Sequence, residues 1–65
     1  MKLEKKRTID FELVNLLMLT ENAHEGFGSY LLSEDNEDFL KTVRAYIRRI
    51  EQQTALVKGL LEEAQ

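Results

Sequence analysis

The sequence predicts an all-α fold, an antiparallel hairpin of two helices that dimerises into a four-helix bundle. The chain of 65 residues has no proline and only three glycines, and strong helix formers dominate its composition. Its β-branched residues are scattered, so no segment has the pattern of a strand. Apolar residues recur at spacings of three and four in two stretches, which the polar segment 33–38 separates.

The length of the chain limits it to one domain, which we place at residues 1–65. Domains this small bury only about 60% of their unfolded surface and commonly depend on disulfides, a metal or an oligomeric partner. The chain has no cysteine and a single histidine, which excludes disulfides and a structural zinc site of ordinary type. We therefore expect support from oligomerisation, and we expect no cofactor.

The second helix is predicted over about residues 36–63, after a turn at 33–36. Ser33, Asp35 and Asn36 can each cap its start, and four acidic residues lie where the helix dipole favours negative charge. Its apolar stripe steps by four and three without a break through Phe39, Val43, Tyr46, Ile50, Gln53, Val57, Leu60 and Ala64, and Leu40, Ile47, Thr54 and Leu61 flank it. Gln53 in this stripe fits a residue that fixes register, or one at the edge of the interface.

The first helix is predicted over about residues 9–32, with residues 1–8 as a basic, flexible arm. Its main stripe is Leu13, Leu16, Thr20, Ala23, Phe27 and Tyr30, and beside it run Leu17, Glu21, His24, Gly28 and Leu31. Gly26 and Gly28 each cost about 1 kcal/mol in a helix relative to alanine. We expect a continuous or slightly kinked helix there, because the apolar residues that follow keep the helical phase.

The first half of this helix is apolar on most sides, and one partner helix cannot cover all of it. Two hairpins sharing their apolar faces form a four-helix bundle, and a two-fold dimer is the commonest oligomer. The predicted oligomer interface is Leu13, Leu16, Leu17, Phe27, Tyr30, Phe39, Val43, Tyr46, Ile47, Ile50, Val57 and Leu60. Phe11, Met18 and Leu19, on the other face, are predicted to form a second contact surface.

Charge is segregated along the chain. Residues 10–38 carry eight acids and no base, whereas residues 39–58 carry five bases and one acid. A chain that folds back at 33–36 brings Glu25 level with Arg44 and Glu21 level with Arg48. These pairs help to select the antiparallel register, although exposed pairs contribute only about 0–1 kcal/mol each.

Glu21 and His24 are the candidate metal ligands, because residues three apart project from one face of a helix. Ferritin-like di-iron proteins use this Glu-x-x-His spacing, and a dimer would supply two copies of it. Against this hypothesis, the facing positions of the second helix are Arg44 and Arg48, and cations there oppose a bound dication.

His24 and Glu25 on the first helix of a dimeric hairpin also resemble the dimerisation domain of histidine kinases. That resemblance implies phosphorylation of His24 with help from the adjacent acid. The family's Arg-Thr-Pro is replaced here by residues 26–28, Gly-Phe-Gly, and the turn follows His24 sooner than in that family. An exposed helix histidine paired with a carboxylate or carbonyl is the simpler interpretation.

The basic arm contains Lys2, Lys5, Lys6 and Arg7, and such arms can bind nucleic acid. The net charge of -3 and the lack of an aromatic residue within the arm argue against this function. No signal peptide or apolar stretch of membrane-spanning length is present, so we expect a cytoplasmic protein. We expect a non-enzymatic interaction or regulatory module that binds itself and a protein partner. The alternatives are a metal-binding or phosphotransfer assembly and a nucleic-acid-binding dimer.

Overall fold

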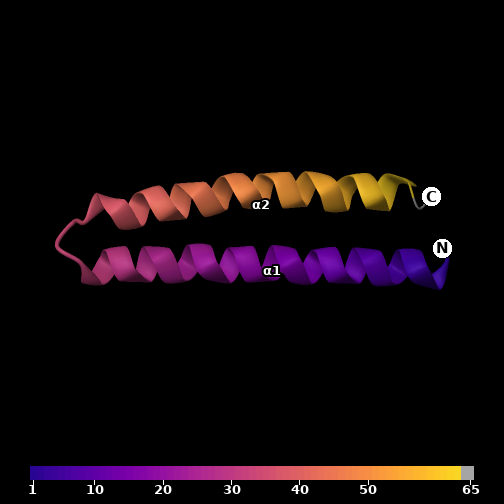
Figure 1. Cartoon of the computed structure of the whole chain (residues 1–65), viewed down its shortest axis with the longest axis horizontal. Coiled ribbons are helices and arrows are strands. Elements are labelled where there is room, and N and C mark those ends of the chain that lie inside the picture. The colour runs from indigo at the N-terminus through magenta and orange to yellow at the C-terminus, as the bar shows by residue number, and fades with distance from the viewer. Residues whose placement is uncertain (64–65) are drawn as a thin grey trace.

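The structure, a computed structural model, describes residues 1–63 as two long helices joined by a short turn. Helix α1 spans Leu3–Leu32 and helix α2 spans Glu37–Glu63. The two helices run side by side in opposite directions, with the chain ends at one end of the rod and the turn at the other (Figure 1). The all-α class and the antiparallel hairpin predicted from the sequence are therefore confirmed. The rod measures 50 × 15 × 10 Å.

Helix α1 begins earlier than the sequence predicted. Its first residue is Leu3 rather than a residue near 9, so most of the expected arm is helical. The segment 3–8 contains no glycine or proline, and the Thr8 hydroxyl donates a hydrogen bond to the Glu4 carbonyl. Lys5 Nζ lies 3.0 Å from Glu63 Oε2, which ties the first turn of α1 to the last turn of α2.

Helix α1 runs without interruption through both of its glycines, neither of which has a positive φ. Gly26 lies where the helices approach closely: a Cβ added there would be 3.2 Å from Val43 Cγ2 and 3.9 Å from Thr42 Cγ2. A Cβ added at Gly28 would meet nothing within 4 Å. Only the first glycine therefore has a packing reason to lack a side chain.

The turn is held by side chains that bond to the backbone. Ser33 Oγ donates to the Tyr30 carbonyl at 2.8 Å and accepts from the Asn36 amide at 3.1 Å. Asn36 Oδ1 accepts from the Asp38 amide at 3.1 Å and so caps α2. Asp35 adopts the left-handed conformation, with a φ of 56°, which aspartate tolerates better than most residues.

The two helices meet along a regular seam, which the least exposed residues mark at alternating spacings of four and three. On α1 the seam is Lys5, Ile9, Glu12, Leu16, Leu19, Ala23, Gly26 and Tyr30; on α2 it is Phe39, Val43, Tyr46, Ile50, Gln53, Val57 and Leu60. This repeat is typical of helices packed at a shallow angle. Among residues 1–63, only Ile9, Ala23 and Val57 are buried, at 5–7% exposure, so the two helices enclose a thin core.

The seam of α2 is the predicted stripe as far as Leu60, and Ala64, the last residue of that stripe, lies outside the described residues. The seam of α1 is rotated from the predicted one. Leu16, Ala23 and Tyr30 face α2 as the sequence suggested. Leu13 and Phe27 remain 45% and 44% exposed, because each follows a seam residue and therefore lies on the side of the contact. The second stripe predicted on α1 is thus separate from its contact with α2.

Candidate self-association surface

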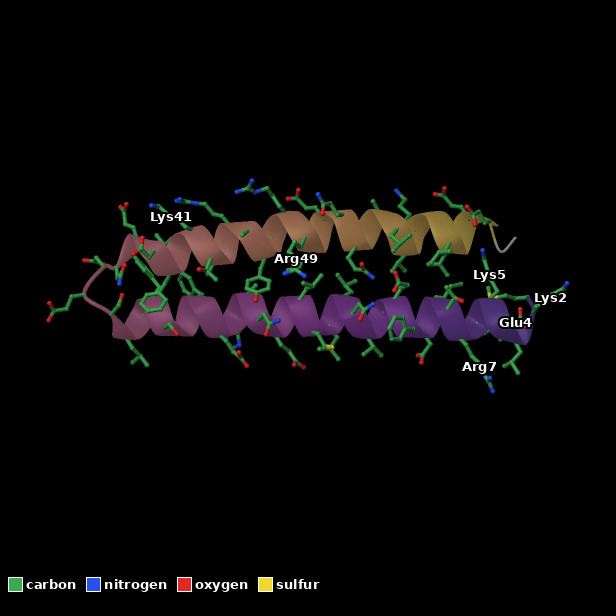
Figure 2. The ribbon with its side chains drawn as sticks, in the orientation of Figure 1. Lys2, Glu4, Lys5, Arg7, Lys41 and Arg49 are labelled. Atoms are coloured by element: carbon green, nitrogen blue, oxygen red, sulfur yellow. The ribbon has the colours of Figure 1, made fainter. Side chains whose placement is uncertain are left out.

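The hairpin has two different long sides, and the first of them is polar. A shallow groove on this side is lined by Asn15, Met18, Leu19, Asn22, Arg49 and Gln53. Arg49 is exposed and points from α2 toward α1 in the view of Figure 2, with its guanidinium 5.5 Å from the centre of the Tyr46 ring. On this polar flank, the residues beside the seam are the ones that precede a seam residue. They include the polar Asn15, Asn22 and Arg49 and also the exposed apolar Phe11, Met18 and Leu56.

The opposite long side of the rod carries more of the exposed apolar residues that flank the seam. Helical geometry places there the residues that follow a seam residue. We call the apolar members of this set the apolar flank: Leu13, Leu17, Phe27, Leu31, Leu40, Ile47 and Leu61. Polar and charged residues that also follow seam residues lie among them: Asp10, Thr20, His24, Arg44, Glu51, Thr54 and Lys58. Six of the seven are exposed, from 44% at Phe27 and Ile47 to 70% at Leu31. Exposed apolar side chains therefore recur along both helices on this side, with polar and charged side chains between them.

The hairpin exposes more surface than a compact monomer of its mass. The chain exposes 5301 Å², whereas a compact monomer of 7.6 kDa exposes about 4,300 Å². The excess of roughly 1,000 Å² per chain would be about 2,000 Å² for two chains, the size of a stable protein interface. The exposed area is thus large enough to accommodate a second copy.

The predicted interface residues divide between two surfaces. Eight lie in the seam within one chain: Leu16, Tyr30, Phe39, Val43, Tyr46, Ile50, Val57 and Leu60. The other four, Leu13, Leu17, Phe27 and Ile47, belong to the apolar flank and stay exposed. Of the predicted second surface, Phe11 and Met18 are 64% and 55% exposed. Leu19 instead lines the groove in the seam.

Gln53 forms a polar contact within the seam. Its Nε2 donates to the Glu12 carbonyl at 2.8 Å and lies 3.4 Å from Glu12 Oε2. Glu12 Oε1 in turn accepts from Asn15 Nδ2 at 2.9 Å. A one-turn slip of α2 would separate these groups, so the contact favours the observed register, as the sequence suggested for Gln53.

The expected ion pairs between the acidic and basic helices do not form within the hairpin. Across residues 1–63 the ion pairs are Lys5 with Glu63, and Lys41 with Asp38 at 3.8 Å. Glu21 falls midway between two seam residues of α1, and Arg48 falls midway between two of α2. Each therefore points away from the other helix of its own chain, although the two lie level along the rod.

Glu21 and His24 both lie on the outer surface of α1, and both are exposed. The described residues contain no group of three or more histidine, cysteine or acidic side chains arranged to hold a metal. Helix α2 lies on the opposite side of α1 and contributes no ligand to this pair. Glu25, the acid adjacent to His24 in the sequence, is also exposed.

The basic residues of the predicted arm diverge on the folded helix. Lys5 turns toward the end of α2, whereas Arg7 projects from the far side of α1 and Lys41 from the far side of α2 (Figure 2). Lys41 also lies at the turn, the end of the rod opposite the arm. In the part of the chain that the structure describes, no helix has the length and apolar character needed to cross a membrane.

Five seam residues of α1 lie outside the stripe predicted from the sequence: Lys5, Ile9, Glu12, Leu19 and Gly26. Ile9 was placed at the helix start, although it is one of the three buried residues. The signal was available: Ile9, Leu16, Ala23 and Tyr30 recur every seven residues. Glu12 was hidden because its charge is atypical of a seam, and it is tolerated there because its carboxylate accepts hydrogen bonds.

Comparison of the chain with protein families, curated proteins and solved structures finds no match.

Proposed function

We propose that this chain is a non-catalytic assembly module that binds a second copy of itself through the apolar flank. The product is a four-helix bundle made of two hairpins. The observation that carries the proposal is the bias of the exposed apolar residues toward one side of the rod, where six of them recur along both helices. Single scattered apolar side chains are normal on a monomer, whereas large exposed apolar residues gathered on one side are typical of an interface.

The free energy available from this surface is of the same order as the cost of forming a dimer. Fully burying a large aliphatic or aromatic side chain contributes about 1.5–3 kcal/mol, and six of the seven side chains are about half or more exposed. Two copies would together gain roughly 10–20 kcal/mol before the cost of association, which is about 4–15 kcal/mol. The difference spans roughly −5 to +16 kcal/mol, a range that contains about 8 kcal/mol, the value for a micromolar dimer.

Two aspartate substitutions on α2 test the proposal. Ile47 and Leu56 have nearly the same exposure, 44% and 46%, but Ile47 belongs to the apolar flank and Leu56 lies on the polar flank. We expect wild type and Leu56→Asp to sediment as dimers at the same concentration. Ile47→Asp should sediment as a monomer, because its carboxylate would have to be desolvated at the interface.

The proposal fails if wild type sediments at 7.6 kDa at every concentration, or if the two variants dissociate equally. Circular dichroism of each variant separates loss of assembly from loss of helix. An equal loss in both variants would indicate that the apolar flank has no special role.

A further inference from the structure

We infer that the two hairpins pair with their turns at the same end, so that α1 of each copy packs against α2 of the other. This inference rests on the proposed self-association and specifies its geometry. The partner is a second copy of this chain, and the two-fold axis runs parallel to the helices. The alternative is a dimer with the turns at opposite ends, in which α1 packs on α1 and α2 on α2.

The charge in the middle of each helix favours a dimer with aligned turns. The central part of α1, residues 10–25, has four acids and no base, whereas residues 41–58 of α2 have five bases and one acid. Reversing one rod end to end still places middle against middle. A dimer with opposed turns therefore brings two acidic segments together and two basic segments together. The dimer with aligned turns instead places each acidic segment against a basic one.

The orientation also determines which residues of the two copies lie at the same height along the rod. Rotation about a two-fold axis parallel to the helices leaves every residue at the same height along the rod. Two residues at equal height within one chain are therefore also at equal height when they belong to different copies. Within the chain, Lys5 contacts Glu63 and Gly26 lies against Val43, so the two numbers in a level pair add up to 68 or 69. The same sum identifies which residues of two copies lie level.

The residues midway between seam residues, which point outward from each helix, also favour aligned turns. When the apolar flanks pack together, these positions border the new contact between α1 and the α2 of the second copy. Four level pairs result: Arg7 with Glu62, Val14 with Ala55, Glu21 with Arg48, and Gly28 with Lys41. Two pairs join opposite charges and one is apolar. Glu21 and Arg48, which have no ion-pair partner among the described residues, would thereby pair between copies.

Spin labels at the two ends of the rod test the orientation, since the chain has no cysteine of its own. Glu34→Cys carries a label in the exposed turn, and Lys2→Cys carries one at the other end of the rod. In a dimer of Glu34→Cys chains, aligned turns place the labels within roughly 10–30 Å of each other, given helix spacings of 8–10 Å and the flexible linkers of the labels. A mixed dimer of the two variants should give a distance near the 50 Å length of the rod.

The reverse result, a long distance between turn labels and a short one in the mixed dimer, would overturn the orientation but not the self-association. A chain that sediments as a monomer would refute both. The two failures are therefore distinguished by one labelled sample and its sedimentation profile.

A charge swap gives a second, independent test. Glu21→Arg and Arg48→Glu should each weaken the dimer, and the double variant should recover it by about twofold to thirtyfold in Kd, as expected for two exposed pairs per dimer. The control is Glu21→Arg with Lys41→Glu, which joins residues at different levels and should show no recovery. Equal recovery in both double variants would reflect net charge alone and would overturn the inferred pairing.

Discussion

Replacing Leu17 with alanine should weaken the dimer strongly while leaving the hairpin almost unchanged. Leu17 is 57% exposed in the single chain, and it belongs to the apolar flank. Its contact with α2 is small, so an alanine there leaves the seam intact and keeps a residue of high helix propensity. The effect should therefore appear in association and not in folding of the hairpin.

The magnitude follows from the exposed fraction of the side chain. Fully burying a leucine contributes about 1.5–3 kcal/mol, and slightly more than half of this remains to be gained at Leu17, or roughly 1–1.7 kcal/mol. The two-fold axis doubles the loss to about 2–3.5 kcal/mol per dimer, which raises Kd by a factor of roughly 30–300.

The matched control is Met18→Ala. Met18 is the next residue in the chain and is equally exposed, at 55%, but it lies on the polar side of α1. We expect its Kd to stay within about threefold of wild type, because surface substitutions outside an interface change free energies by only about 0.5 kcal/mol. Sedimentation equilibrium of the three proteins measures the difference. Equal Kd values for the two variants would refute the assignment of the interface to the apolar flank.

Three further predictions concern the hairpin itself. Gly28→Ala should raise the free energy of unfolding by up to about 1 kcal/mol, because alanine has the higher helix propensity. Gly26→Ala should be stabilised less, or destabilised, because the new Cβ would meet Val43. Thermal unfolding of both variants at one concentration measures the difference. Asp35→Gly should keep or improve stability, whereas Asp35→Val should cost about 1–2 kcal/mol in a left-handed backbone, and similar melting temperatures for the two would contradict the observed turn. The pKa of Tyr30 is raised, first by the negative charge of Asp35 and then by partial burial and the hydrogen bond to that carboxylate. The folded chain thus holds this proton more tightly than the unfolded chain, so the stabilisation is complete below the ordinary pKa of about 10 and is lost as pH rises through the raised value. Asp35→Asn should lower the pKa of Tyr30 in an NMR titration of its ring signals, and an unchanged titration would contradict the contact.

The sequence was sufficient to predict α2 in full because its apolar stripe is narrow and unbroken. Phe39, Val43, Tyr46 and Ile50 allow one helical phase only, and the acids before them mark the start. The sequence also predicted that helix α1 forms, but it did not predict which face of α1 packs against α2. The apolar residues of α1 surround most of the helix, so several phases bury similar areas, and the packing of Gly26 against Val43 decides among them.

The candidate surface was predictable in its chemistry but not in its location. The surplus of apolar residues on α1 indicated that the hairpin needed a further partner. Which apolar residues stay exposed depends on which residues of α1 form the seam. A shift of the seam by one residue moves Leu13 and Phe27 from the contact with α2 to the side of that contact. The outward direction of Glu21 and Arg48 depends on the same phase, which is why pairs expected within the chain do not form there.

The contact between Lys5 and Glu63 also has a consequence for how the hairpin folds and opens. Every contact across the seam closes a loop that includes the turn, and the loop lengthens steadily toward the chain ends, where it spans 58 residues. Because short loops close fastest and at the least entropic cost, pairing should start at the turn and proceed along the rod like a zipper. Two of the three buried residues, Ile9 and Val57, lie toward the end that closes last. Burial of these residues and the ion pair oppose opening at the end of the rod where chain entropy favours it most. Amide hydrogen exchange at that end should therefore be slower than expected from the length of the loop alone.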